Sequence, residues 1–195
     1  MVKNNVNDAY QVQKVFSILQ HSHQPTMLEQ FSHYNTFQQL IATLLSSRTK
    51  DTTTIPIAKK LFVKYQTPED FLNAKVVILE KELYGIGFYR VKAKNIRKLS
   101  KIILENFNGK VPENFEGLTS FPGVGRKTAN CMLSYAFRVP AIAVDIHVHR
   151  ISNRLGWVTT KNPEETEKEL RRILPRELWS KVNELLVDHG QRVCL

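Results

Sequence analysis

Cysteine is almost absent from this sequence, since only Cys131 and Cys194 occur among its 195 residues. Two thiols cannot build the disulfide framework of a small secreted protein, and they suit a reducing compartment. Long apolar runs are also missing, because none approaches the roughly 20 residues of a membrane span. The first ten residues are too polar for a secretory signal, so we expect a cytoplasmic protein.

Acidic residues are also few compared with basic residues. The chain has 18 Asp and Glu against 28 Lys and Arg, which gives a formal net charge of +10 at pH 7. An excess of this kind favours polyanionic partners such as DNA, RNA or an anionic membrane surface, although it can also serve solubility alone. The hydrophobic share of 42% is ordinary for a globular protein, and the length suits one large domain or two small ones.

Strand patterns are lacking as well. Apart from a short apolar run at 141–144, the apolar residues follow helical rather than period-two spacing. Residues 1–21 predict an amphipathic helix and residues 37–45 a buried helix. A last helix is expected over 177–189, ending at Gly190. The predicted fold class is therefore all-α.

The break Pro122-Gly123-Val124-Gly125 organises the middle of the chain. Helical spacing restarts only behind it, so we predict a tight hairpin between a short helix ending near Ser120 and a longer helix starting near Arg126. Glycines let the backbone adopt positive φ and approach a partner, and the unpaired N–H groups of the new helix point the same way. This arrangement predicts a phosphate-binding loop made by Gly123, Val124, Gly125 and Arg126.

Lys127 and Asp145 are the residues of this region that can carry chemistry. Lys127 lies in the first turn of the new helix, where the positive end of the helix dipole disfavours its protonated form, and a neutral amine is a nucleophile. Asp145 follows the apolar run and precedes another helical stretch, which places a carboxylate at a helix N-terminus. Two alternatives stay open, namely a plain phosphate-binding role for Lys127 and an ordinary N-cap role for Asp145.

The pattern Asp-x-His-x-His that starts at Asp145 has three ligand types at alternating positions. In a strand these side chains would face one ion, but in a helix His147 and His149 diverge by about 200° and cannot chelate together. Ile151 and Leu155 favour a helix, so we predict no metal site here.

A second Gly-apolar-Gly sequence, Gly85-Ile86-Gly87, is followed by Phe88 and a basic helix. We predict a second hairpin that contacts a nucleic-acid backbone through Gly85 and Gly87. Phe88 either wedges between bases or packs in the core. Basic side chains recur along one face of the following helix, which indicates either a solvated surface or a backbone contact: Arg90, Lys94, Arg97 and Lys101.

The segments FPGVGRKTAN and VDIHVHRISNRL together resemble the helix-hairpin-helix and Gly/Pro-Asp signature of the endonuclease III family of DNA base-excision glycosylases. More loosely, the resemblance extends from Phe37 to Cys194. It implies a monomeric, nucleoid-associated repair enzyme that acts on damaged double-stranded DNA, removes oxidised pyrimidines and cuts the strand by β-elimination. The rivals are a DNA-binding module without chemistry and a monofunctional mismatch glycosylase, against which Lys127 argues.

The resemblance also implies roles for single residues. Lys127 would attack the sugar and form a Schiff base, while Asp145 would stabilise positive charge on the sugar and help deprotonate the amine. The segment SSRTKD matches the turn that fills the hole left by the extruded nucleotide. The family usually has glutamine where this chain has Arg48, and arginine can still stack on bases and hydrogen-bond to the orphaned partner. A solvated basic turn is the alternative for Arg48.

We expect two helical lobes with a cleft between them that places Lys127 opposite Asp145. Residues 27–138 would form the lobe that carries the hairpin, and residues 1–26 with 139–195 would form the other.

One feature departs from the family. Its members typically end with four cysteines that hold a [4Fe–4S] cluster, and Cys194 stands where the first would be. Cys131 is the only other thiol, so this sequence cannot supply four thiolate ligands. We expect either a member without a cluster or a sequence cut short where the cluster loop would begin, and the residues present support no cofactor.

Overall fold

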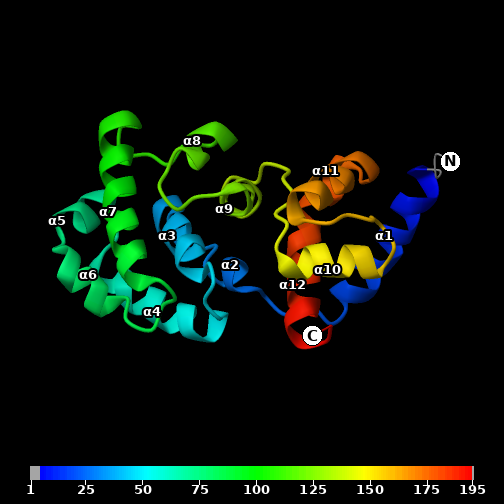
Figure 1. The fold of residues 1–195 in the computed structure, drawn as a ribbon, viewed down its shortest axis with the longest axis horizontal. Coiled ribbons are helices and arrows are strands. Elements are labelled where there is room, and N and C mark those ends of the chain that lie inside the picture. The colour runs from blue at the N-terminus through cyan, green and yellow to red at the C-terminus, as the bar shows by residue number, and fades with distance from the viewer. Residues whose placement is uncertain (1–4, 195) are drawn as a thin grey trace. The chain divides into compact units, whose positions relative to one another are not determined.

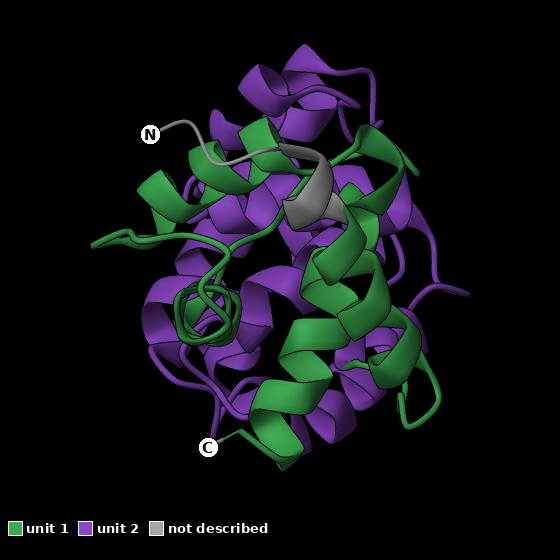
Figure 2. Cartoon of the chain, turned by 90° about the vertical axis from the view of Figure 1, so that its right-hand side faces the viewer, with its two compact units in different colours: residues 1–26, 138–195 green, residues 27–137 purple. Residues whose placement is uncertain are grey.

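The computed structural model describes residues 5–194, and that range contains helices and no strand. The all-α prediction is therefore confirmed. The chain divides into two compact units, the hairpin unit of residues 27–137 and the terminal unit of residues 1–26 with 138–195 (Figure 2). Across the described part of the chain, no helix combines the length and hydropathy needed to cross a lipid bilayer.

The hairpin unit is made of helices that contact helix α3 or one another (Figure 1). In chain order they are α2 (Met27–Gln30), α3 (Thr36–Ser46), α4 (Asp51–Lys64), α5 (Pro68–Asn73), α6 (Val76–Glu82), α7 (Tyr89–Asn106), α8 (Phe115–Thr119), α9 (Arg126–Cys131) and the π-helix η1 (Met132–Ala136).

Helix α3 begins with a capping box. The Asn35 side chain accepts from the Gln38 amide at 2.8 Å, and the Gln38 side chain accepts from the Asn35 amide at 3.3 Å. The rest of the helix is largely apolar, and Leu40, Ile41 and Leu45 are fully buried. The helix is therefore fixed along its length, and it presents the following turn, residues 46–50, at its C-terminal end.

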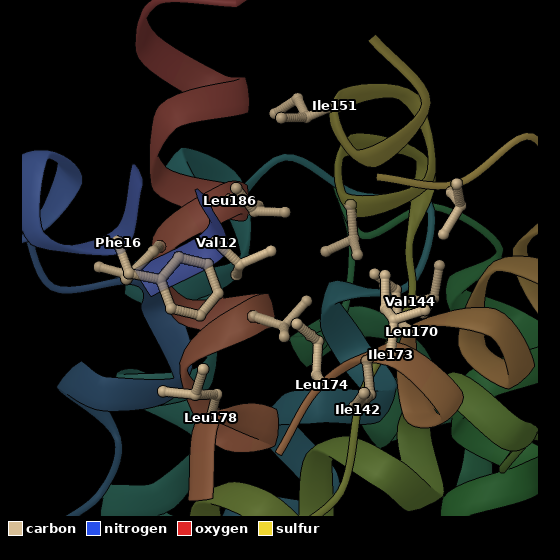
Figure 3. Packing of buried hydrophobic residues seen from close by; sticks show 14 of the residues in the cluster. Val12, Phe16, Ile142, Val144, Ile151, Leu170, Ile173, Leu174, Leu178 and Leu186 are labelled. Atoms are coloured by element: carbon tan, nitrogen blue, oxygen red, sulfur yellow. The ribbon is translucent and has the colours of Figure 1, made fainter. Parts of the chain in front are cut away.

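The terminal unit contains α1 (Asn5–Gln20), α10 (Ile146–Arg154), α11 (Pro163–Ile173), the 3-10 helix η2 (Arg176–Leu178) and α12 (Trp179–Arg192). Of the helix predicted over 1–21, residues 1–4 lie outside the described range. Val12 and Phe16 of α1 pack into one core with side chains from the C-terminal helices, as the helical spacing predicts (Figure 3).

The apolar run before α10 is buried but forms no strand. Ile142 and Ala143 are fully buried, and the Ala143 carbonyl accepts from the side-chain amide of Asn183 on α12 at 2.8 Å. Val144 joins the core of the terminal unit. These contacts fix the backbone that leads into α10 and therefore the position of Asp145 within this unit.

Two helices differ from the sequence prediction. Helix α12 does not end at Gly190 but continues to Arg192. A Cβ atom on Gly190 would lie 2.6 Å from Nδ1 of His147, so glycine is required here by close packing and not by a helix end. The long helix expected behind the hairpin becomes a π-helix at Met132, with the Phe137 amide donating to the Met132 carbonyl at 3.1 Å.

Candidate functional site

The hairpin between α8 and α9 contains one glycine with positive φ and one glycine with open space around it. Gly123 has φ of 86°, which favours glycine, and a Cβ there would lie 2.9 Å from the side-chain nitrogen of Asn95 on α7. Gly125 has extended backbone (φ −95°, ψ −177°) and is the N-cap of α9, and a Cβ on it would meet nothing within 4 Å. Only Gly125 therefore leaves room for a ligand to approach the backbone.

Apolar side chains anchor this hairpin from within. Phe121 is buried against the Phe107 ring, with centroids 5.5 Å apart. Val124 is also buried, and its amide donates to the Phe121 carbonyl at 3.1 Å. Of the four residues predicted to contact phosphate, Val124 thus stabilises the turn with both its side chain and its N–H group.

The two residues behind Gly125 differ in exposure. Arg126 is exposed, and its guanidinium lies 4.9 Å from the centre of the Phe115 ring on α8. Lys127 is half-buried in the first turn of α9, as predicted. The structure thus places an arginine and a lysine directly after the open backbone at Gly125.

Asp145 is the N-cap of α10, and its carboxylate is half-buried. One oxygen, Oδ1, accepts from the amides of His147 and Val148, both at 2.9 Å. The capping alternative is therefore correct for Oδ1, and neither of these two bonds engages Oδ2.

The two histidines of α10 enter separate interactions. His149 Nδ1 lies 2.7 Å from Thr166 Oγ1 on α11, whereas His147 Nδ1 lies 3.3 Å from a guanidinium nitrogen of Arg150. The segment is helical, as expected, and helical geometry turns the two rings to different sides. These contacts give His147 and His149 structural roles within the terminal unit.

Arg48 and Phe88 form a pair on the hairpin unit. The Arg48 guanidinium lies 5.6 Å from the Phe88 ring centre, and both residues have positive φ, 53° and 58°. Phe88 is 61% exposed, so the alternative that placed it in the core is wrong. Two exposed side chains capable of stacking are thus held together by unusual backbone geometry.

The second Gly-apolar-Gly segment supports this pair. Gly85 has φ of 99°, whereas a Cβ on Gly87 would lie 2.5 Å from the Arg48 carbonyl oxygen. The Gly87 amide donates to Thr49 Oγ1 at 3.0 Å. Glycine at position 87 is therefore needed for packing against the 46–50 turn, and its N–H group is already bonded.

The basic face of α7 is partly structural. Arg97 donates to the Leu72 carbonyl at 2.9 Å, and Lys101 lies 3.6 Å from the Glu105 carboxylate. The Arg90 guanidinium lies 5.4 Å from the Tyr89 ring, and Lys94 is exposed. Three of the four basic side chains in the predicted stripe therefore contact other residues of the protein, namely Arg90, Arg97 and Lys101.

Sequence reasoning missed Lys92, which is 7% exposed. Its ammonium donates to three oxygens: the carbonyls of Leu45 (2.9 Å) and Ser47 (2.6 Å) and the hydroxyl of Thr49 (3.3 Å). Burial lowers the pKa of Lys92 to about 8, so the ammonium form still prevails at neutral pH. The available signal was its position four residues before Ile96, on the apolar face of α7.

The cysteines do not fit a four-thiolate cluster. Cys131 is buried in α9 of the hairpin unit, and Cys194, which follows α12 in the terminal unit, accepts a hydrogen bond from Arg154 at its sulfur at 3.0 Å. With two thiols in the whole sequence, a [4Fe–4S] centre lacks its ligands among these residues.

Comparisons with known proteins agree on one family. A model described as "HhH-GPD superfamily base excision DNA repair protein" matches residues 41–176. Endonuclease III of Thermotoga maritima is 49% identical over 158 residues, which cover 81% of this chain and 74% of that protein. Endonuclease III of Bacillus subtilis is 46% identical over 163 residues, covering 83% and 74%.

A solved structure is similar over almost the whole chain. It is described as a trapped endonuclease III–DNA covalent intermediate, in an estranged-adenine complex. The match has a TM-score of 0.82 and 39% identity, and it covers 94% of this chain and 87% of that one.

Proposed function

Since this chain belongs to the HhH-GPD superfamily of base excision DNA repair proteins, and within it to the endonuclease III family, we propose that it is a bifunctional DNA glycosylase and abasic-site lyase. The observation that carries this proposal is the position of Lys127, which lies in the first turn of α9 beside the open backbone of Gly125. A related protein that reacts covalently with DNA supports the same reading.

Lys127 is the proposed nucleophile. Its neutral amine attacks C1′ of the damaged nucleotide, a bond from nitrogen to C1′ forms, and the bond from C1′ to the base breaks as the base leaves with a proton. Opening of the sugar ring gives a protonated Schiff base. Loss of a proton from C2′ then expels the 3′ phosphate, which breaks the strand. A chain with no amine at this position would stop after base removal.

Asp145 is the proposed carboxylate of this reaction. Because its Oδ1 is fixed by two amides of α10, its Oδ2 has a defined position within the terminal unit. An anionic oxygen held in this way stabilises the positive charge that develops on the sugar and accepts a proton from the attacking amine. We propose that Lys127 and Asp145 act on the same nucleotide.

The hairpin unit supplies the proposed DNA contacts. The Gly123–Gly125 turn and Arg126 would hold a backbone phosphate, with Gly125 as the point of closest approach. Arg48 and Phe88 would enter the base stack when the damaged nucleotide is extruded, which costs a few kcal/mol in an intact duplex. The Gly85–Gly87 loop would act by supporting this pair.

We further propose that the substrate is an oxidised pyrimidine in double-stranded DNA, that the protein acts as a monomer, and that it is nucleoid-associated in the cytoplasm. The formal charge of +10 at pH 7 supports attraction to DNA. A module that only binds DNA would use Lys127 as a phosphate contact, and the similarity to endonuclease III of two bacteria favours the enzyme over that module.

Borohydride trapping on duplex DNA with an abasic site tests the enzyme directly, because reduction of the Schiff base leaves a covalent adduct. The wild-type chain should form this adduct, and Lys127→Gln should form none while binding DNA with nearly unchanged affinity. Lys110→Gln is a matched control that removes the same charge from an exposed position of the same unit. Loss of affinity without an effect on trapping would instead assign Lys127 to phosphate binding.

A further inference from the structure

The buried ammonium of Lys92 meets the C-terminal end of α3. The carbonyls of Leu45 and Ser47 accept hydrogen bonds from Lys92 Nζ at 2.9 and 2.6 Å. Leu45 is the penultimate residue of α3, and Ser47 is its C-cap. Carbonyls at a helix C-terminus lack partners within the helix and carry the negative end of its dipole. A cation at this position therefore satisfies groups that an apolar side chain would leave unpaired.

The same ammonium also reaches the following turn. Thr49 Oγ1 accepts from Lys92 Nζ at 3.3 Å and from the Gly87 amide at 3.0 Å. Gly87 in turn packs against the Arg48 carbonyl. Residues 46–50 and the loop before α7 are thus joined through one hydroxyl, one amide and one ammonium. Thr49 and Gly87, which take part, adjoin Arg48 and Phe88 in the chain.

Stability of the hairpin unit alone does not explain this arrangement. Burying an ammonium is costly compared with burying an apolar side chain of similar size. Helix α3 is already held by fully buried residues such as Leu40 and Ile41. What those apolar contacts do not determine is the path of the chain after Ser46, where Arg48 takes a left-handed conformation.

We propose that Lys92 is a positioning residue for opening the DNA duplex, because it holds the 46–50 turn in the conformation that keeps Arg48 stacked with Phe88. This inference rests on the proposed function. Lys92 does not touch the substrate and acts through the turn. Its loss should therefore impair the processing of lesions inside a duplex, while the reaction at Lys127 itself continues.

The first test compares two DNA substrates. Lys92→Met should cut an abasic site in duplex DNA about tenfold more slowly or worse, since misplacement by about 1 Å can cost up to a hundredfold. The same site in single-stranded DNA should be cut within about twofold of the wild-type rate, because no base stack has to be opened. Lys98→Met, which removes the same charge from an exposed position of α7, should match the wild type on both substrates.

The second test is a double-mutant cycle on the duplex substrate. In a Phe88→Ala background the additional change Lys92→Met should slow cutting of the duplex little further, because both changes remove the same stacked Arg48–Phe88 pair. Thr49→Val provides a milder variant if Lys92→Met does not fold, since it removes the shared hydroxyl and should show the same selective loss on duplex DNA.

Failure of the positioning role of Lys92 and failure of the proposed enzymatic function give different results. Equal losses on duplex and single-stranded DNA, or additive effects of Lys92→Met and Phe88→Ala, would overturn the positioning role while the enzyme remains. If the wild-type chain cuts neither substrate and forms no trapped adduct, the proposed function itself is wrong.

Discussion

The guanidinium of Arg48 lies 5.6 Å from the ring centre of Phe88, and both residues have left-handed backbone geometry. That conformation costs a non-glycine residue about 1 kcal/mol. Such strain persists only where the surrounding structure imposes it, and it occurs often at functional sites. Here Gly87, Thr49 and Lys92 contact one another around the 46–50 turn, and two side chains capable of stacking are exposed to solvent.

Replacing Phe88 by glycine tests whether this strain serves function. Phe88→Gly should leave the melting temperature unchanged or raise it, since relief of the positive φ is worth about 1 kcal/mol and the ring is 61% exposed. Excision from duplex DNA should fall about tenfold or more, because base unstacking then lacks its wedge. Thermal melting and single-turnover nicking measure the two effects.

Asn108→Gly is the matched control for that experiment. Asn108 is exposed and also has positive φ, 51°, but lies in the turn after α7. It should gain less stability than Phe88→Gly, because asparagine tolerates this conformation better than phenylalanine, and it should keep full activity. A stability loss of about 3 kcal/mol or more in Phe88→Gly would mean that the ring belongs to the core after all.

The closely packed Gly87 and the open Gly125 allow a second pair of variants. Gly87→Ala places a Cβ 2.5 Å from the Arg48 carbonyl, and we expect it to cost about 1–3 kcal/mol in the free energy of unfolding and to displace the turn. Gly125→Ala meets nothing within 4 Å and should cost less than about 1 kcal/mol. Urea unfolding measures both values.

Affinity for DNA distinguishes the roles of these glycines further. Gly125→Ala should weaken binding to undamaged duplex, since the added methyl group occupies the space through which a phosphate reaches the backbone. Fluorescence anisotropy with a labelled duplex measures this. Unchanged affinity in a folded Gly125→Ala variant would mean that the backbone at Gly125 does not contact DNA.

The two roles of Asp145 can be separated by the choice of substituent. Asp145→Asn keeps an oxygen that can cap α10, so the free energy of unfolding should change little. Removal of the carboxylate charge should lower the rate of base excision by a hundredfold or more, on the order of 2.7 kcal/mol. Asp145→Ala should lose both, with about 1 kcal/mol of stability. An Asp145→Asn variant with wild-type turnover would reduce this residue to a helix cap.

The buried carboxylate of Asp188 gives the terminal unit a predicted pH dependence. Burial by itself would raise the pKa of Asp188, but hydrogen bonds from the Arg192 guanidinium and the Gln24 amide outweigh it and hold the pKa below its usual value. A carboxyl group whose pKa is lowered by folding contributes stability above its unfolded value of about 4, and this contribution is lost as the pH falls through the folded value.

Asp188→Asn should therefore cost about 1–3 kcal/mol at pH 7 and progressively less as the pH is lowered from 4 toward 2. Urea unfolding of both proteins across this range measures the difference. Glu169→Gln is the control, because its pair with Arg172 is solvent-exposed and should contribute less than about 1 kcal/mol. A difference between wild type and Asp188→Asn that stays constant with pH would contradict the assignment.

Signals that act within a few residues determined much of this protein. The break at Pro122–Gly125 predicted the hairpin, the first turn behind it placed Lys127, and the apolar run before Asp145 predicted an N-cap, all as observed. Caps, turns and helical periodicity are local interactions, so the order of residues alone is sufficient to specify them.

Only the tertiary structure decided which residues from distant parts of the chain contact one another. The exposure of Phe88, the need for glycine at 87 and 190, and the buried ammonium of Lys92 depend on partners from distant parts of the chain. Lys92 bonds to a carbonyl 47 positions earlier, and Gly87 to a hydroxyl 38 positions earlier. Periodicity reports which face of a helix is apolar but not which neighbour covers it, because packing is set by side chains that the local sequence does not contain.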